Sequence, residues 1–320
     1  MEFRAIQEPV RTIPGIKYFQ AYVDRLDFES RKAHCLDAFV AGHEFELNFD
    51  YLILAAGCET NTFNVKGVEG TKNVFFLKQL SDSRAIRTRL IECFERASSP
   101  GTQPAEIASL LTFVVVGGGP TNVEFAAELY DFLQKDVSRW YPDLYQHAKV
   151  KIVEASGHIL GSFNGSLVHY VEKLFQSRRV DVLTGPSVPL SVTNSRPLSF
   201  SFPPSLVLFW LLGKAVSEIR GQEAVLQSGE AIPFGLLVWS AGIRPVQLIR
   251  SLPTALVAKS PQGRLLVDPC LRVLAPAAPA GTESSRRLLA GGRVFAMGDC
   301  AADAAKPLPA LAQVLPPLAI

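Results

Sequence analysis

The sequence lacks an excess of charge of either sign. Its 320 residues carry 32 basic and 30 acidic side chains, and the formal net charge at pH 7 is +2. No run of lysine or arginine forms the basic stripe that a nucleic-acid backbone requires. We therefore expect no nucleic-acid partner.

Cysteine and histidine are scarce and unpatterned. The five cysteines include no CxxC pair, and the five histidines are equally dispersed. Metal sites and disulfide frameworks need these residues at characteristic spacings. We expect no metal site, and we interpret the cysteines as reduced, buried thiols of an intracellular protein; they are Cys35, Cys58, Cys93, Cys270 and Cys300.

Long apolar segments are also missing. The longest uninterrupted run spans residues 206–212, whereas a membrane-spanning helix needs ~20 residues. Met1 is followed at once by Glu2, Phe3 and Arg4, so we expect no targeting signal in this chain. A hydrophobic content of 48% still allows a sizeable core, and the length predicts about two domains.

A glycine-rich turn in the middle of the chain is the strongest local signal. Residues 111–116 form an apolar run typical of a strand buried on both faces. The turn follows as Gly117, Gly118, Gly119, Pro120, Thr121 and Asn122. Apolar side chains at helical spacing come next, at Val123, Ala126, Ala127, Tyr130 and Leu133. Strand, glycine turn and helix in this order predict a dinucleotide-binding fingerprint.

Each position of the turn has a physical role. Gly117 permits the tight turn, and Gly119 lets backbone N–H groups approach a pyrophosphate at the positive end of the helix. Asn122 stands where the fingerprint has its third glycine, so its side chain must be accommodated where helix and strand pack closely. The alternative interpretation is a glycine-rich turn that binds nothing.

An acidic residue is expected at the end of the next strand, where it would bind ribose hydroxyls. Residues 149–153 fit that strand and Glu154 ends it. Glu154 lies 37 positions after Gly117, more than the usual gap of roughly 20–30, and we expect residues 135–148 to form a longer helix and loop. A carboxylate repels a 2′-phosphate, so NADH is favoured over NADPH. The alternative is a solvated strand end.

Two nine-residue segments, 49–57 and 234–242, align without gaps. Each is an apolar strand that ends in Ala-Gly, at Ala56 and Gly57 and at Ala241 and Gly242. The second copy closes the domain that the glycine turn opens, so by symmetry the first closes another dinucleotide domain. Residues 1–49 hold no strand–glycine turn–helix pattern, and we expect that half-motif to be missing. The alternative is a coincidental similarity of two buried strands.

A third segment, 294–301, is a short apolar strand stopped by Gly298 and Asp299, with a helix expected after it. In a flavoprotein, Gly298 would let the chain pass close to the pyrophosphate. Asp299 would accept a hydrogen bond from a ribitol hydroxyl. Taken alone, Gly-Asp is an ordinary turn.

In this order the segments resemble the two-dinucleotide-binding-domain flavoproteins, and finer features are similar to the type II (alternative, non-proton-pumping) NADH:quinone oxidoreductases. The segments that carry the resemblance are 4–11, 51–57, 113–129, 152–160, 238–242, 294–301 and 308–314. The resemblance implies an α/β fold with two Rossmann-like FAD/NAD(P)-binding domains, the flavin domain being incomplete. It implies a partial FAD-binding domain at residues 1–79 and 268–320 and an NADH-binding domain at residues 80–267.

The resemblance also implies site residues. NADH would be held by Gly117, Gly118, Gly119, Pro120, Asn122, Glu154, Ala241 and Gly242, and FAD by Ala56, Gly57, Gly298 and Asp299. Glu124 matches the glutamate that lies near the nicotinamide, and it is the candidate catalytic residue; the alternative is an exposed residue in the first helical turn. Ala312 and Gln313 match the start of the quinone-site sequence.

The resemblance implies an enzyme that passes hydride from NADH to FAD and electrons on to a quinone of the respiratory chain. It implies peripheral association with the mitochondrial inner membrane through a C-terminal tail that we expect to be missing here, and it allows a homodimer. Two alternatives stay open: a pyridine nucleotide disulfide reductase of the same fold, and a non-catalytic nucleotide-binding remnant.

An anomalous insertion spans residues 186–214. Its 29 residues hold five prolines, six serines and two charges, and a surface loop this apolar is hard to justify. When Gly185 is joined to Ala215, the flanks read as strand, turn and strand. We interpret the segment as an unspliced intron or a gene-model error; the alternatives are a genuine insertion and a membrane-touching loop. Residues 275–285 are interpreted as a surface loop.

A helix is expected to connect the two domains. Ser81 and Asp82 predict its cap, and Ile86, Leu90 and Phe94 share one face.

Overall fold

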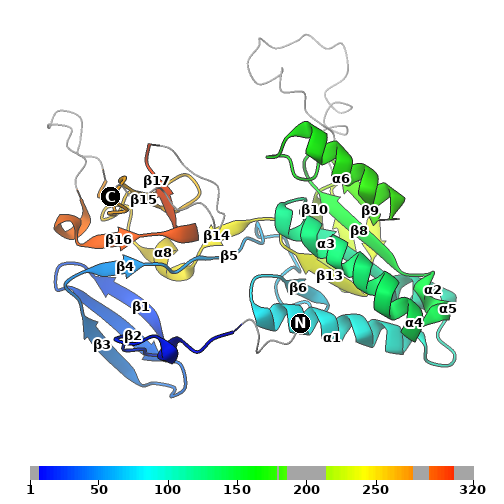
Figure 1. Cartoon of the computed structure of the whole chain (residues 1–320), viewed down its shortest axis with the longest axis horizontal. Helices are drawn as coiled ribbons and strands as arrows, with labels where there is room; N and C mark the ends of the chain where they lie inside the picture. Colours follow the sequence, from blue (N-terminus) through cyan, green and yellow to red (C-terminus); the bar gives the residue numbers. More distant parts are fainter. Residues whose placement is uncertain (1–6, 179, 186–213, 277–287, 306–320) are drawn as a thin grey trace, which may run out of the picture. The chain divides into compact units, whose positions relative to one another are not determined.

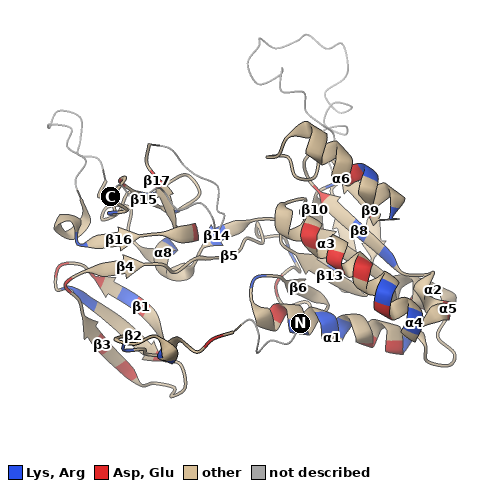
Figure 2. Ribbon diagram, viewed as in Figure 1, with Lys and Arg blue, Asp and Glu red and all other residues tan. Residues whose placement is uncertain are grey.

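The computed structural model describes residues 7–178, 180–185, 214–276 and 288–305. Contacts within the chain define two compact units (Figure 1). Unit 1 combines Met1–Cys58 with Arg244–Ile320, and unit 2 is the continuous segment Glu59–Ile243. Lysine and arginine lie interspersed with aspartate and glutamate on the helices of unit 2 (Figure 2).

Unit 2 is built on a five-stranded parallel sheet. Its strand order is β6 (Val74–Phe76), β13 (Leu236–Trp239), β7 (Thr112–Val116), β8 (Lys149–Glu154) and β9 (Val180–Thr184). The predicted buried strand after residue 111 is β7, and all five of its residues are buried. This order, with successive strands β7, β8 and β9 side by side, is that of a dinucleotide-binding domain.

Both faces of this sheet are covered, as the continuous apolar run of β7 requires. Phe113 and Val115 belong to the core that packs against helices, whereas Val114 and Val116 belong to the core on the other face. The helices are α1 (Leu80–Ala97), α3 (Pro120–Phe132) and α6 (Gly165–Ser177). The other face is covered by an antiparallel sheet of β10 (Val216–Arg220), β11 (Glu223–Leu226) and β12 (Ala231–Pro233).

The connection from β7 to β8 is long, as the spacing predicts. Helix α3 continues directly into a π-helical turn, η3 (Leu133–Val137). Two short helices follow, α4 (Ser138–Trp140) and α5 (Pro142–Tyr145). These elements account for the gap between Gly117 and Glu154.

Helix α1 begins slightly earlier than the predicted cap. Gln79 is the N-cap residue, and the Oδ2 atom of Asp82 accepts hydrogen bonds from the backbone nitrogens of Gln79 (2.7 Å) and Lys78 (2.9 Å). Asp82 therefore caps the helix from its third position, while Ser81 already lies inside it. Ile86, Leu90 and Phe94 are buried, as predicted; α2 (Pro104–Leu110) leads from α1 to β7.

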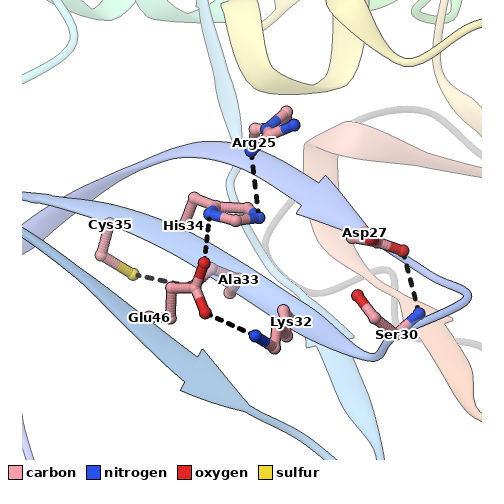
Figure 3. A network of polar contacts seen from close by, with 8 residues as sticks. All are labelled: Arg25, Asp27, Ser30, Lys32, Ala33, His34, Cys35 and Glu46. Atoms are coloured by element: carbon pink, nitrogen blue, oxygen red, sulfur yellow. Dashed lines mark hydrogen bonds and ion pairs between the residues drawn. The ribbon is translucent and has the colours of Figure 1, made fainter.

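Unit 1 contains a three-stranded antiparallel sheet of β1 (Ala21–Asp27), β2 (Lys32–Asp37) and β3 (Glu44–Asn48). A polar network crosses it (Figure 3). Glu46 accepts from Lys32 Nζ at 2.7 Å and pairs with His34 Nδ1 at 3.1 Å, and His34 Nε2 lies 3.3 Å from Arg25 Nη2. Cross-strand pairs of this kind stabilise a sheet by modest amounts each.

The rest of unit 1 packs around a separate core. Strand β4 (Leu52–Leu54) pairs in parallel with β16 (Val294–Ala296), and β15 (Leu265–Val267) pairs with β17 (Ala301–Asp303). The core is formed by Leu54, Ile249, Leu252, Val257, Leu265, Val267, Val273, Leu289, Val294, Ala296 and Cys300. The short helices are η2 (Val10–Thr12), α8 (Gln247–Ser251), η5 (Leu289–Gly292) and η6 (Gly298–Cys300). Strands β5 (Cys58–Thr60) and β14 (Ile243–Pro245) pair where the chain passes from one unit to the other.

The unit boundaries differ from the predicted ones at residues 79/80 and 267/268. Residues 59–79 carry β6, which pairs with β13, so they belong with the middle unit. Residues 244–267 carry Ile249 and Leu265, which lie in the core of unit 1. The assignment of one cofactor to each domain stays a prediction.

Three further expectations concern the insertion, the loop at residues 275–285 and the segment after Gly298. The strands on either side of the insertion, β9 and β10, lie in different sheets, so they form no hairpin. Residues 186–213 and 277–287 lie outside the described residues, which leaves the interpretation of the insertion and of the loop untested. The expected helix does not follow Gly298 directly: a single 3-10 turn leads into β17, because Ala302 packs into the interior as part of a strand paired with β15. Residues 306–320 lie outside the described residues.

Candidate nucleotide-binding site

The glycine turn follows the carboxyl end of β7 and leads directly into α3. Gly119 is the N-cap residue and Pro120 is the first helical residue, where its fixed φ suits the helix and its missing N–H costs nothing. Gly117 has a φ of +112°, a conformation that only glycine adopts easily. Its N–H donates to Val153 O at 2.8 Å, and Leu160 N donates to Gly118 O at 2.7 Å. The turn is thereby fixed between β8 and the segment that follows it.

The three glycines meet different surroundings. A Cβ on Gly117 would lie 2.6 Å from Asn122 Nδ2 and 2.7 Å from Ala241 Cα. A Cβ on Gly118 would lie 2.9 Å from Glu154 Cγ. Gly119 has no atom within 4 Å of that position. The first two glycines therefore permit tight packing, and the third faces open space at the start of a helix, where a phosphate fits.

Asn122 occupies the place of the third glycine without disturbing the turn. The side chain is fully buried, and its Nδ2 atom donates to Val116 O at 2.9 Å. Its Oδ1 atom is buried with no hydrogen-bond partner among the described residues. Because Gly117 has no side chain, the amide of Asn122 fits beside it. The fingerprint therefore tolerates asparagine in place of its third glycine.

Glu154 lies directly against the glycine turn. Its Oε2 atom accepts a hydrogen bond from Gly118 N at 2.5 Å, and its Oε1 atom accepts from Ser156 N at 2.7 Å. Each carboxylate oxygen can accept more than one hydrogen bond. Lone pairs therefore remain for the two hydroxyls of a ribose, beside the turn that would hold the pyrophosphate.

Ala241 and Gly242 follow β13 at the same edge of the sheet. A Cβ on Gly242 would lie 2.9 Å from the Phe63 ring, and Asn61 N donates to Gly242 O at 2.8 Å. Trp239 Nε1 also donates to Asn61 O, at 2.9 Å. No sequence motif assigns residues 61–63 to the site; the turn-forming Asn61 and Asn64 indicate only a loop there.

Glu124 is exposed on α3, just beyond the first helical turn and not within it. It is therefore available to a ligand that reaches the surface of this helix. Its catalytic role stays a prediction.

The four residues predicted to hold FAD gather at one edge of unit 1. Because β4 and β16 are parallel and paired, Ala56 and Gly57 follow one strand at the edge where Gly298 and Asp299 follow the other. Gly57 and Gly298 have φ values of +68° and +72°, and neither has an atom within 4 Å of a Cβ position. Two glycines with open space at the ends of parallel strands fit close passage of a dinucleotide.

Asp299 is held at this edge by its neighbours. Cys58 Sγ donates to Asp299 Oδ2 at 3.0 Å, and Met297 N donates to Leu54 O at 3.0 Å. A carboxylate fixed beside two open glycines fits a ribitol hydroxyl. Ala312 and Gln313, predicted for the quinone, lie outside the described residues.

All five cysteines are free, and four are buried; the expectation of burial is wrong for Cys270, which lies exposed in the turn after β15. Burial raises the pKa of Cys93 to about 11 and also raises the pKa of Cys35 and of Cys300. These three thiols stay protonated near neutral pH and are poor nucleophiles.

The described ranges contain no cluster of three or more histidine, cysteine, aspartate or glutamate side chains suited to a metal ion. Within the same ranges, no helix combines the length and hydropathy that crossing a bilayer requires.

Comparison with known proteins identifies several similar sequences. Residues 6–199 match the family described as pyridine nucleotide-disulphide oxidoreductase. A probable NADH dehydrogenase of Dictyostelium discoideum is 36% identical over 318 residues, which are 98% of this chain and 60% of that protein. The external alternative NAD(P)H-ubiquinone oxidoreductase B4, mitochondrial, of Arabidopsis thaliana is 37% identical over 255 residues, 77% of this chain and 40% of that protein. The chain thus spans about half the length of the curated relatives it matches.

A solved structure shares the fold. NDH2 from Plasmodium falciparum in complex with NADH superimposes with a TM-score of 0.70 at 24% identity, covering 89% of this chain and 50% of that one.

Proposed function

We propose, since the chain belongs to the pyridine nucleotide-disulphide oxidoreductase family, that it forms the NADH-binding unit and part of the FAD-binding unit of a type II NADH:quinone oxidoreductase. One observation carries the proposal. The glycine turn, the start of α3 and Glu154 meet at the carboxyl edge of a parallel sheet. The names of the relatives from Dictyostelium and Arabidopsis support the choice of NADH and quinone.

Unit 2 binds NADH through its backbone and one carboxylate. The open face at Gly119 and the start of α3 receive the pyrophosphate, because the positive end of the helix dipole favours an anion there. Glu154 accepts from the adenosine ribose hydroxyls and repels a 2′-phosphate. Glu124 contributes from the surface of α3 near the nicotinamide.

Unit 1 positions the flavin. The flavin of FAD, held at this edge, would supply the hydride acceptor for NADH and the electron donor for a quinone. Gly57 and Gly298 let the backbone pass close to the flavin nucleotide, and Asp299 orients it by accepting a hydrogen bond. Ala312 and Gln313 belong to the quinone site.

The disulfide-reductase alternative needs a reactive thiolate. Burial raises the pKa of Cys35, Cys93 and Cys300, so these three thiols are poor candidates for that role.

The setting of the enzyme is proposed from its relatives. The external NADH-ubiquinone oxidoreductase 2 of Saccharomyces cerevisiae, 33% identical over 313 residues, is also named mitochondrial. We propose that this protein lies in mitochondria as a peripheral protein of the inner membrane; the family resemblance also allows a homodimer.

The test uses the protein encoded by the full-length transcript. NADH oxidation is measured with a water-soluble ubiquinone analogue and, separately, with oxidised glutathione as acceptor. We expect flavin-dependent reduction of the quinone alone. Asp299→Asn should lower the flavin content, whereas Asp24→Asn, an equal change on the exposed face of β1, should not. Reduction of the disulfide in preference to the quinone would overturn the proposal.

A further inference from the structure

A polar pocket lies in unit 2 at the edge of the parallel sheet opposite the glycine turn. It has a volume of about 320 Å³ and is lined by Thr71, Lys72, Asn73, Arg89, Glu92, Arg96, Gly221 and Gln222. Asn73 directly precedes β6, and Gly235, which binds Arg89, precedes β13. The five residues of β7 separate this edge from Gly117 by roughly 16 Å. The pocket is therefore distinct from the proposed NADH site.

Arg89 is the central feature of the pocket. Its side chain is only 5% exposed, its Nε atom donates to Gly235 O at 3.0 Å, and its Nη1 atom lies 3.1 Å from Glu92 Oε1. The Nη2 atom is buried and has no hydrogen-bond partner within the described ranges. A guanidinium is always charged, and a buried charged donor without an acceptor is costly. The arrangement calls for an acceptor that the described residues do not supply.

The charges around this atom favour an anion. Lys72 and Arg96 add two cations to Arg89, and Glu92, the single carboxylate of the lining, is already paired with Arg89. Arg96 also faces Glu106, at 3.4 Å, but both side chains are about half exposed, so that pair is weak. Neutral polar side chains from Thr71, Asn73 and Gln222 complete the lining.

We propose that this pocket binds a small oxyanion of the phosphate class, with Arg89 as the buried anchor and Lys72 at the rim. Arginine and lysine together suit a phosphate group, which offers acceptors in several directions. The group can arrive as free phosphate or as the phosphoryl group of a small phosphomonoester.

The test measures thermal unfolding of the whole chain at constant ionic strength. Chloride is replaced stepwise by inorganic phosphate, by glycerol 3-phosphate or by acetate. Either phosphate ligand should raise the melting temperature by about 2–4 °C when it is well above its dissociation constant. The more effective of the two identifies the source. No stabilisation beyond chloride, or an equal effect of acetate, would contradict the proposal.

Variants locate the bound ion. Lys72→Gln and Gln222→Glu change exposed rim positions and should weaken phosphate binding about 3- to 10-fold. Their matched controls, Lys173→Gln on α6 and Gln134→Glu on η3, make the same changes at exposed positions of unit 2. Arg89→Met should abolish binding, and the rim variants keep the test valid if that protein does not fold. Phosphate affinity that both rim changes leave equal to that of the unaltered chain would assign the ion to another site and overturn the proposal.

Discussion

Glu154 shows how a single residue serves both the fold and the proposed site. The sequence predicts its place at the end of a strand, but not that its carboxylate binds Gly118 N and Ser156 N. Those contacts depend on the path of the chain after β8, and no local sequence pattern predicts that path. The same limit applies to Phe63, which packs beside Gly242 from a loop far away in the sequence.

Replacing Glu154 tests its proposed role in cofactor choice. Glu154→Gln keeps the size of the side chain but removes the charge. NADH binding should weaken by about 1–3 kcal/mol, while NADPH binding should improve because the repulsion of the 2′-phosphate is lost. Glu128→Gln, an equal change at an exposed position of α3, is the control. An unchanged ratio of NADH to NADPH affinity, measured by titration calorimetry, would count against the assignment.

Cys93 makes stability depend on alkaline pH. Burial raises its pKa from 9.0 to about 11, so the unfolded chain loses this proton first. The protonated Cys93 thiol contributes its full share to the free energy of unfolding below pH 9.0. That share is lost as the pH rises towards 11. The loss should amount to about 2–3 kcal/mol in the free energy of unfolding.

Denaturant titrations across that range check this prediction. Cys93→Ala, although less stable throughout, should lose less stability between pH 9 and 11 than the unaltered protein does. Cys270→Ala, at the exposed thiol, should behave like the unaltered protein. If the free energy of unfolding depends equally on pH in both variants, ionisation of Cys93 does not cause the loss of stability.

At the scale of elements, local signals were sufficient for β7, the glycine turn, α3 and β8. Each lies within one stretch of sequence, and the apolar period of each matches its burial. The sequence was less informative where a distant partner decides the structure. The residues after Gly298 form β17 because they pair with β15, and a run of small residues alone does not reveal that pairing.

The junction of β7 and α3 offers a test of Asn122. Asn122→Asp removes the donor to Val116 O and places a carboxylate in a fully buried position. We expect a loss of about 3 kcal/mol or more, seen as a lower melting temperature. Thr121→Asp, at the exposed neighbouring position of the helix start, should have little effect or stabilise slightly. If the two variants melt alike, the burial of Asn122 has no bearing on stability.

At the scale of the whole molecule, the sequence predicted the two-unit organisation but not where the units divide. Strand β6 has three residues, and its partner β13 lies more than 150 positions later, so no local feature assigns residues 59–79 to unit 2. The aligned segments 49–57 and 234–242 predicted the two units more reliably. They end in the Ala-Gly pairs that the structure places at the edges of the two candidate cofactor sites.

We propose above all that unit 2 holds NADH at the open face of Gly119. The most direct test is calorimetric titration of the chain with NADH, with Gly119→Asp compared against Gly165→Asp. Both glycines lie at the start of a helix with open space around them, so both changes are tolerated by the fold. We predict saturable binding that survives Gly165→Asp and falls at least tenfold in Gly119→Asp, because the new carboxylate repels the pyrophosphate. Equal NADH affinity of the two variants, or no saturable binding by the unaltered chain, would contradict NADH binding at Gly119.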